Sequence, residues 1–170
     1  MQRSSRWIVR VVAVMLVLFV PEAGFAETPQ TPQAIVEKYC SLDAQGGNFS
    51  SSNPNFRAIG ELLINEDEAA YDSSVVIRSY RIRRLKISLD SADVEVLYAD
   101  LGMVSGGELK KKRRSELVIF HLTKVGSDWK IDGLRIFPHV SKAWLLSEFS
   151  KGLTSVQARD SKSIKELSQW

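Results

Sequence analysis

Apolar residues after residue 30 recur every three or four positions, which predicts a first helix. They are Ile35, Val36, Tyr39, Cys40 and Leu42. Thr31 and Pro32 are typical of a helix start, because a threonine hydroxyl caps the first turn and proline suits the first helical position. Gly46 and Gly47 are expected to end this helix.

A second, shorter helix is predicted over residues 55–64. Its apolar side carries Phe56, Ile59, Leu62 and Leu63. The acidic residues that follow are Glu66, Asp67, Glu68 and Asp72. They lack the ligand spacing and the turn glycine of a calcium loop, so the pattern favours a solvated acidic face over a metal site.

The period of the apolar positions changes from helical to alternating after Ser74, which predicts strands. Tyr80 and Ile82 share one phase, and the next apolar residues, Leu85, Ile87 and Leu89, take the other. The slip at residues 83–84 predicts either a bulge or a strand that changes partners. Residues 90–93 are expected to form a turn, and Val94, Val96 and Tyr98 alternate on the next strand.

A loop with Gly102, Gly106 and Gly107 is expected to lead through a basic run into the final hairpin. In that hairpin Gly126 and Ser127 suit a two-residue type II′ turn, which favours glycine at its first central position. The turn predicts that Lys124 faces Trp129, Leu122 faces Ile131, His121 faces Asp132 and Phe120 faces Gly133. One face then carries the expected core residues Val118, Phe120, Leu122, Trp129 and Ile131, and the last strand is expected to end near Pro138.

Val140, Trp144, Leu145 and Phe149 predict a C-terminal helix, and residues 154–170 read as a polar, frayed tail. The predicted fold class is α+β. N-terminal helices pack on a curved antiparallel sheet, a cone, which the C-terminal helix and the tail follow. Residues 27–153 are expected to form one domain, because their length suffices to bury a core without disulfides.

The N-terminus has the pattern of a secretory signal over residues 1–26. Arg3, Arg6 and Arg10 precede ten residues without a polar side chain, and Gly24, Phe25 and Ala26 suit a signal peptidase. The apolar run is short for a membrane anchor, which needs about 20 residues. We therefore expect cleavage after Ala26, a periplasmic or secreted protein, and no stable membrane span after cleavage.

Loss of residues 1–26 lowers the net charge from +3 to +1, because they carry three arginines and one glutamate. A balance of this kind predicts no nucleic-acid partner. Cys40, the single cysteine, lies on the apolar side of the predicted helix and is interpreted as a buried small side chain. Because no Cys and His cluster has metal-ligand spacing, neither a metal nor another cofactor is expected.

The order of these elements resembles the nuclear-transport-factor-2-like (cystatin-like) superfamily, and in particular its small secreted bacterial members of unknown function. The stretches that carry the resemblance are TPQAIVEKYCSLDAQG near the start and SDWKIDGLRI in the final hairpin. It implies a cone-shaped α+β fold and no particular activity. DWKIDG followed by HVSKAWLLSEF is also similar to periplasmic phospholipid carriers of the outer-membrane lipid-asymmetry pathway.

Enzymes of this superfamily place an Asp, His or Tyr inside the cone, and His121 with Asp132 is the candidate acid–base pair here. The predicted register puts both on the face away from Phe120 and Trp129, which favours a cross-strand surface pair over a catalytic dyad. His139 is expected to cap a helix or to lie in a turn. The chain has no nucleophile elbow, phosphate loop or zinc motif, so a binding role is favoured over catalysis.

The basic run consists of Lys110, Lys111, Lys112, Arg113 and Arg114. Its simpler interpretation is a soluble loop or a guarded sheet edge, since lysine protects edges from aggregation. Contact with an anionic surface, such as lipopolysaccharide or phospholipid headgroups, is the functional alternative.

The favoured function is an exported binding or accessory protein of the cell envelope, which holds an apolar ligand or a protein partner. Five aromatic residues are expected to line the ligand space: Tyr39, Tyr80, Tyr98, Phe120 and Trp129. An alternative is that these side chains pack solidly and leave no cavity. The pattern also leaves open a small hydrolase or isomerase that uses polar groups in the cone, a phospholipid carrier, and a homodimer or protein partner bound through the sheet face.

Overall fold

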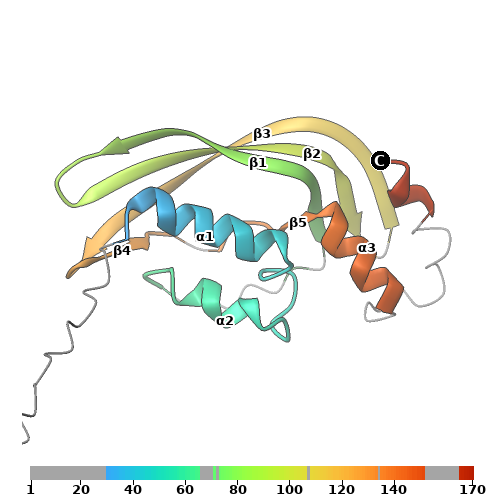
Figure 1. Ribbon diagram of the computed structural model, residues 1–170, viewed down its shortest axis with the longest axis horizontal. Coiled ribbons are helices and arrows are strands. Elements are labelled where there is room, and N and C mark those ends of the chain that lie inside the picture. Colours follow the sequence, from blue (N-terminus) through green and yellow to red (C-terminus); the bar gives the residue numbers. More distant parts are fainter. Residues whose placement is uncertain (1–29, 66–70, 72, 107, 134, 152–164) are drawn as a thin grey trace, which may run out of the picture.

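The computed structural model describes residues 30–65, 71, 73–106, 108–133, 135–151 and 165–170. A curved five-stranded sheet in the order β4-β3-β2-β1-β5 forms the centre of the fold. Three long strands, β1 (Ser73–Ile87), β2 (Ser91–Ser105) and β3 (Glu108–Val125), arch over the helix α1 (Pro32–Ala44), as Figure 1 shows. The predicted α+β class is confirmed.

The first helix begins and ends as the sequence predicts. The Thr31 hydroxyl accepts a hydrogen bond from the Ala34 N–H at 3.2 Å, and Pro32 occupies the first turn. After Ala44 the chain turns through Gly46, whose φ of 80° is accessible to glycine at little cost. The buried side of α1 carries Ile35, Val36, Tyr39, Cys40 and Asp43.

The second helix, α2 (Asn55–Gly60), is shorter than predicted. The reason is a pair of backbone hydrogen bonds with β4 (Asp128–Ile131): Ile131 N–H donates to the Leu62 carbonyl at 2.8 Å, and Ile64 N–H donates to the Ile131 carbonyl at 3.0 Å. Pairing with a strand therefore replaces the last turn of the expected helix. The acidic residues 66–68 and 72 lie outside the described residues.

The bulge expected at residues 83–84 is present, since the β1–β2 register shifts between Ile82 and Arg84. The following turn lies earlier than predicted. Strand β2 already begins at Ser91, and the Ser88 N–H donates to the Ser91 carbonyl at 2.8 Å.

Of the two simpler interpretations of the basic run, the soluble loop is wrong and the sheet edge fits, because the run lies inside β3, which pairs with β4 only at residues 122–125. Lys110 pairs with Met103, Lys111 with Gly102, and Arg114 with Asp100. Only the turn near Gly106 separates β2 from β3, because the pairing of the two strands continues up to Ser105 and from Glu108. A shift in register between Asp100 and Gly102 interrupts this pairing and lets the strands bend.

The final hairpin has the predicted register, with Leu122 opposite Ile131 and Lys124 opposite Trp129. Gly126 has φ +64°, whereas no described residue other than glycine has a positive φ, which fits a type II′ turn. The last strand of the hairpin ends at Ile131, not near Pro138. Beyond Gly133 the chain crosses beneath the sheet, and β5 (His139–Ser141) pairs in parallel with β1, so the sheet is mixed and the expectation of a purely antiparallel sheet is wrong.

Two apolar cores cover the two sides of β1 near its start. Val75 and Ile77 belong to the core shared with α1, whereas Val76 belongs to the core shared with α3 (Lys142–Lys151). Residues 165–168 form a helical turn whose Leu167 is fully buried in the α3 core. The frayed end expected for the tail is therefore not found at residues 165–170.

The predicted signal, residues 1–26, lies outside the described residues. Within the described ranges, no helix has both the length and the apolar character needed to cross a membrane.

Candidate functional site

The five aromatic residues expected to line a cavity form part of the α1 core. Tyr39, Tyr98 and Phe120 are buried, and Tyr80 and Trp129 are half-buried at its margin. The Tyr39 and Phe120 rings meet edge to face with their centroids 5.2 Å apart, and the Tyr80 and Tyr98 rings lie 6.2 Å apart. These side chains pack against one another between α1 and the sheet.

Behind these aromatic rings lies a buried polar cluster around Asp43 and His139. The Asp43 carboxylate accepts a hydrogen bond from the His139 backbone N–H at 2.9 Å, and the His139 ring stacks on Tyr98 with centroids 4.0 Å apart. His139 Nδ1 lies 3.8 Å from Asp43 Oδ2, and its Nε2 lies 4.0 Å from Glu116 Oε2. His139 thus lies in a strand, not in a helix cap or turn.

Burial controls the titration of this cluster. It raises the pKa of Asp43 to about 8, although hydrogen bonds from His139 and Asn48 and the charge of Arg135 act in the opposite direction. Burial lowers the pKa of His139, although the nearby carboxylates Glu116 and Asp100 act to raise it. Both groups are therefore mostly uncharged at neutral pH, and the short Asp43–His139 distance is not an ion pair.

Tyr39 connects the polar cluster to the chain that crosses beneath the sheet. Its hydroxyl accepts hydrogen bonds from the Asn48 side chain at 2.9 Å and from the Ile136 backbone at 3.1 Å. Arg135 donates to Asn48 Oδ1 at 3.0 Å, and its guanidinium lies 3.8 Å from the centre of the Phe56 ring. These contacts join α1, α2 and the crossing segment.

Cys40 is buried, as the sequence predicts, and its sulfur lies 3.1 Å from the Tyr98 hydroxyl. Burial raises the pKa of the Cys40 thiol to about 12 and that of Tyr98 well above its usual value. The thiol is therefore protonated and shielded from solvent, which makes it a poor nucleophile.

The structure does not pair the side chains of His121 and Asp132. His121 Nδ1 instead lies 2.7 Å from Asp93 Oδ1 on β2, and the Thr123 hydroxyl donates to Asp132 at 3.4 Å. The backbone register is nevertheless the expected one, since the Asp132 N–H donates to the His121 carbonyl at 2.8 Å. His121 and Asp93 are exposed to solvent, which is typical of a cross-strand surface pair.

The basic run divides its side chains between different contacts. Arg114 donates to Asp100 at 2.8 Å and to Glu116 at 2.7 Å, whereas Arg113 donates to the Trp170 carbonyl oxygen at 3.3 Å. Lys112, Arg114, Asp100 and Glu116 line a cleft of about 350 Å³. Two positive and two negative groups leave this cleft without a net charge.

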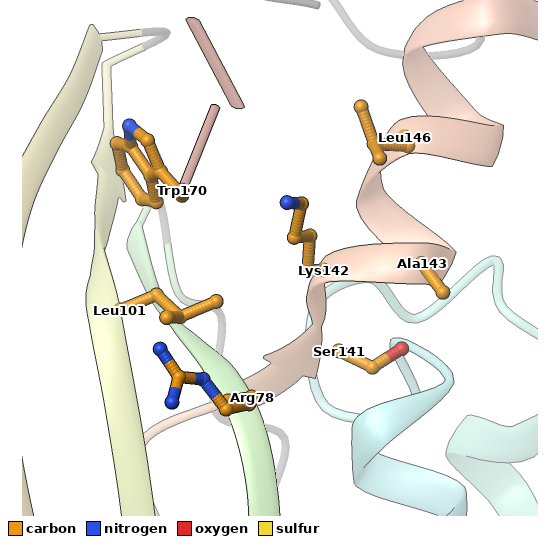
Figure 2. A pocket seen from close by; sticks show the side chains of 7 residues that line it. All are labelled: Arg78, Leu101, Ser141, Lys142, Ala143, Leu146 and Trp170. Atoms are coloured by element: carbon orange, nitrogen blue, oxygen red, sulfur yellow. The ribbon is translucent and has the colours of Figure 1, made fainter. Parts of the chain in front are cut away.

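A second cleft, of about 370 Å³, lies between the sheet and α3. Figure 2 shows Arg78 and Leu101 from the sheet on one side, Ala143 and Leu146 from α3 on the other, and Lys142 between them. The Trp170 ring closes one end, where it packs over Gly102, a residue whose missing side chain leaves it room. We call this space, lined also by Ser141, the α3 cleft.

The α3 cleft is positively charged. Among the residues that the structure describes, its lining holds Arg78 and Lys142 and no acidic residue. Lys142 Nζ donates to the Ser168 carbonyl at 3.1 Å, while within the described ranges Arg78 forms no ion pair. Arg78 lies at a bulge, because the β1–β2 register shifts between Ile77 and Ser79, and a bulge of this kind redirects a side chain.

Sequence reasoning missed Asp43 and the residues of the α3 cleft, and it expected His139 in a helix cap or a turn. Asp43 directly follows Leu42 in the chain, and the helical pattern of apolar residues did not mark it as buried. Only the parallel strand β5 brings His139 to it. The feature of the sequence that could have indicated the α3 cleft is Lys142, which follows Ser141 at the start of an apolar helix. Nothing in the sequence around Trp170 indicated that it lines the cleft, because it follows a polar stretch.

Comparisons with known proteins add no relative. No protein-family model, no curated protein and no solved structure matches this chain. In the part of the chain that the structure describes, no group of three or more metal-ligating side chains comes together. The candidate site is therefore defined by the charge and shape of the α3 cleft.

Proposed function

We propose that this chain is an exported binding protein of the periplasm or cell exterior, and that it holds a small amphiphilic anion in the α3 cleft. The observation that carries the proposal is that the described lining of the cleft combines two basic side chains, Arg78 and Lys142, with apolar walls and holds no acidic residue. The basic groups bind a carboxylate or phosphate, and Leu101, Leu146 and Trp170 contact its apolar part.

The size of the cleft limits the ligand. Its volume of about 370 Å³ lies near the lower end of the range for ligand pockets, roughly 300–1,000 Å³. One short acyl chain or one aromatic acid suits this space better than a phospholipid with two chains. The proposal thus narrows the apolar ligand expected from the sequence to a small anion.

The packing of aromatic side chains between α1 and the sheet also favours this location. The Tyr39 and Phe120 rings are buried in contact with each other, and Tyr98 is buried in the same core, so a ligand there would have to displace core side chains. The resemblance to nuclear-transport-factor-2-like proteins implies a fold and no particular activity, so the proposed role depends on the α3 cleft itself.

An acid–base enzyme is less well supported. Asp43 has a pKa raised to about 8, which suits a general acid or base, and such shifts are frequent at active sites. However, Asp43 is fully buried, and neither the α3 cleft nor the cleft beside Arg114 is lined by it or by His139. A substrate in either cleft would not reach these groups without a change in structure.

Isothermal titration calorimetry tests the proposal with four amphiphiles that share an eight-carbon chain. They are octanoate, octyl phosphate, octyltrimethylammonium and octyl glucoside. We expect saturable binding of the two anions, at least about tenfold tighter than that of the cation or the neutral glucoside. Equal binding of all four would show a non-specific apolar surface and would contradict the proposal.

Substitutions locate the binding. Arg78→Gln and Lys142→Gln should each weaken octyl phosphate binding about tenfold or more, because each removes a charge-assisted hydrogen bond. Lys38→Gln is the matched control, since Lys38 is an exposed lysine on α1 away from the cleft. A similar loss for all three variants would indicate attraction by overall charge instead of the α3 cleft.

A further inference from the structure

The cleft beside Arg114 is separate from the α3 cleft, and among the described residues the two share no lining residue. Its volume of about 350 Å³ lies near the lower end of the range for ligand pockets, roughly 300–1,000 Å³. Charged side chains of both signs line it together with apolar ones. We call this space the Arg114 cleft.

Pairing of β2 with β3 brings the charged side chains of the Arg114 cleft together. Lys112, Arg114 and Glu116 alternate along β3, so their side chains point to the same face of the sheet. Asp100 lies opposite Arg114 in the register, next to the shift that bends both strands. Acidic and basic groups therefore lie side by side on one face.

Arg114 connects the two carboxylates of the cleft. Its Nε donates to Asp100 Oδ2 at 2.8 Å, and its Nη2 donates to Glu116 Oε2 at 2.7 Å. These charge-assisted hydrogen bonds fix the positions of both carboxylates but use only one oxygen of each.

This internal pairing leaves polar atoms of both signs without a partner in the described part of the chain. The Asp100 side chain is only 1% exposed, and its Oδ1 has no hydrogen-bond partner there. A buried carboxylate oxygen without a partner is costly, so a donor from outside the chain is expected near it. Glu116 is 34% exposed, with its contacts on Oε2 and none on Oε1, and the exposed Lys112 forms no ion pair with a described residue.

The apolar wall of the Arg114 cleft comes from three segments: Val75 on β1, Met103 on β2, and Phe137 on the chain that crosses beneath the sheet. The Phe137 ring meets the Tyr71 ring edge to face, with their centroids 5.5 Å apart, which holds it in position. Met103 is 37% exposed, so part of this wall is open to a ligand. An apolar group bound here would bury exposed carbon atoms.

The charges of the cleft select the class of ligand. A ligand with only a negative group would be repelled by Asp100 and Glu116, and one with only a positive group would be repelled by Lys112 and Arg114. A ligand that carries both charges close together avoids both repulsions. An α-amino acid has this property, because its ammonium and carboxylate groups are attached to the same carbon atom.

We propose that the Arg114 cleft binds a free α-amino acid with an apolar side chain. The ligand's ammonium group donates to Glu116 and is attracted by the charge of Asp100. Its carboxylate accepts from Lys112 and from the remaining N–H groups of Arg114. Its side chain packs on the apolar wall. The proposal is independent of the anion bound in the α3 cleft.

Equilibrium dialysis with radiolabelled leucine tests the proposal, and three unlabelled analogues compete for the bound leucine. Isocaproate lacks the ammonium group, isoamylamine lacks the carboxylate, and ε-aminocaproate is an isomer of leucine with its two charges at opposite ends. We expect saturable leucine binding, and each analogue should displace it at least about tenfold less well than unlabelled leucine does. An anion that enters the α3 cleft does not displace leucine, so the competition reports on the Arg114 cleft alone.

Substitutions locate the leucine site. Lys112→Gln and Glu116→Gln should each weaken leucine binding about tenfold or more, because each removes one charge that contacts the ligand. Lys111→Gln and Glu108→Gln are the matched controls, since both residues are exposed charges on β3 that do not line the cleft. Circular dichroism should show that the variants keep the fold. Lys112 is exposed and unpaired among the described residues, so Lys112→Gln decides the outcome if Glu116→Gln alters the fold.

Three results would overturn the proposal. The first is the absence of saturable leucine binding at millimolar concentration. The second is displacement by any of the three analogues as efficient as that by leucine, since adjacent opposite charges would then not be required. The third is leucine binding that Lys112→Gln leaves intact or that Lys111→Gln weakens equally, because the ligand would then lie elsewhere or respond to overall charge.

Discussion

The carboxylate of Asp43 accepts a hydrogen bond from the backbone N–H of His139, at 2.9 Å, across nearly a hundred residues of sequence. Both residues are buried, and the contact joins the end of α1 to the short parallel strand β5. Since Asp43 is mostly protonated at neutral pH, this link depends on pH.

The first prediction concerns that dependence. An unfolded aspartate has a pKa of about 3.9, whereas burial raises the pKa of Asp43 to about 8 in the folded protein. Between these values the unfolded state loses its proton and the folded state keeps it. Raising the pH therefore lowers the free energy of unfolding, by roughly 1 kcal/mol for each pH unit. The stability that Asp43 contributes is present below about pH 4 and is lost by about pH 8.

Asp43→Asn removes this titration and keeps an oxygen that accepts from His139. Denaturant unfolding of both proteins between about pH 5 and pH 8 should show that the variant gains stability relative to the unmodified chain as the pH rises. All other ionisable residues are the same in both proteins, so the difference reports on Asp43 and the groups in contact with it. A difference that stays constant with pH would contradict the raised pKa.

The second prediction compares two residues that the sequence placed in the same core. Phe120 is buried against Tyr39, whereas Trp129 is half-buried at the edge of the core. Phe120→Ala should lower the free energy of unfolding by about 3–5 kcal/mol. Trp129→Ala should cost less, because part of its ring is already in solvent. An equal or reversed order in denaturant unfolding would mean that the packing of the hairpin differs.

The third prediction uses two glycines with positive φ. At Gly126, with φ +64°, an added Cβ meets no atom within 4 Å, so Gly126→Ala should cost only the backbone strain, about 1–3 kcal/mol. At Gly46, with φ +80°, the added Cβ would lie 2.1 Å from the Trp144 ring. Gly46→Ala should therefore cost more than Gly126→Ala in thermal or denaturant unfolding. Equal costs would show that Trp144 moves freely.

The fourth prediction concerns export. The basic residues at the start, the apolar run over residues 11–20 and the small residues before Glu27 predict that the exported protein begins at Glu27. N-terminal sequencing of protein from the periplasm or the medium checks this. Recovery of Met1 from that fraction would contradict cleavage.

Local patterns in the sequence were sufficient for the first helix, for the bulge near residue 83 and for the turn at Gly126 with its register. Each depends on residues close in the chain: a capping threonine, a slip in alternation, and a glycine whose positive φ closes a two-residue turn. The α+β class follows from the same change of period.

Tertiary structure decided the features that depend on distant segments. Strand β4 shortened α2 by pairing with Leu62 and Ile64, and β2 turned the basic run from an expected loop into a strand. The parallel strand β5 brought His139 to Asp43, and the turn at residues 165–168 brought Trp170 to Arg78 and Lys142. Periodicity reports which side of an element is apolar, but not which segment covers that side. The candidate ligand cleft therefore emerges only when all strands and the C-terminal turn are in place.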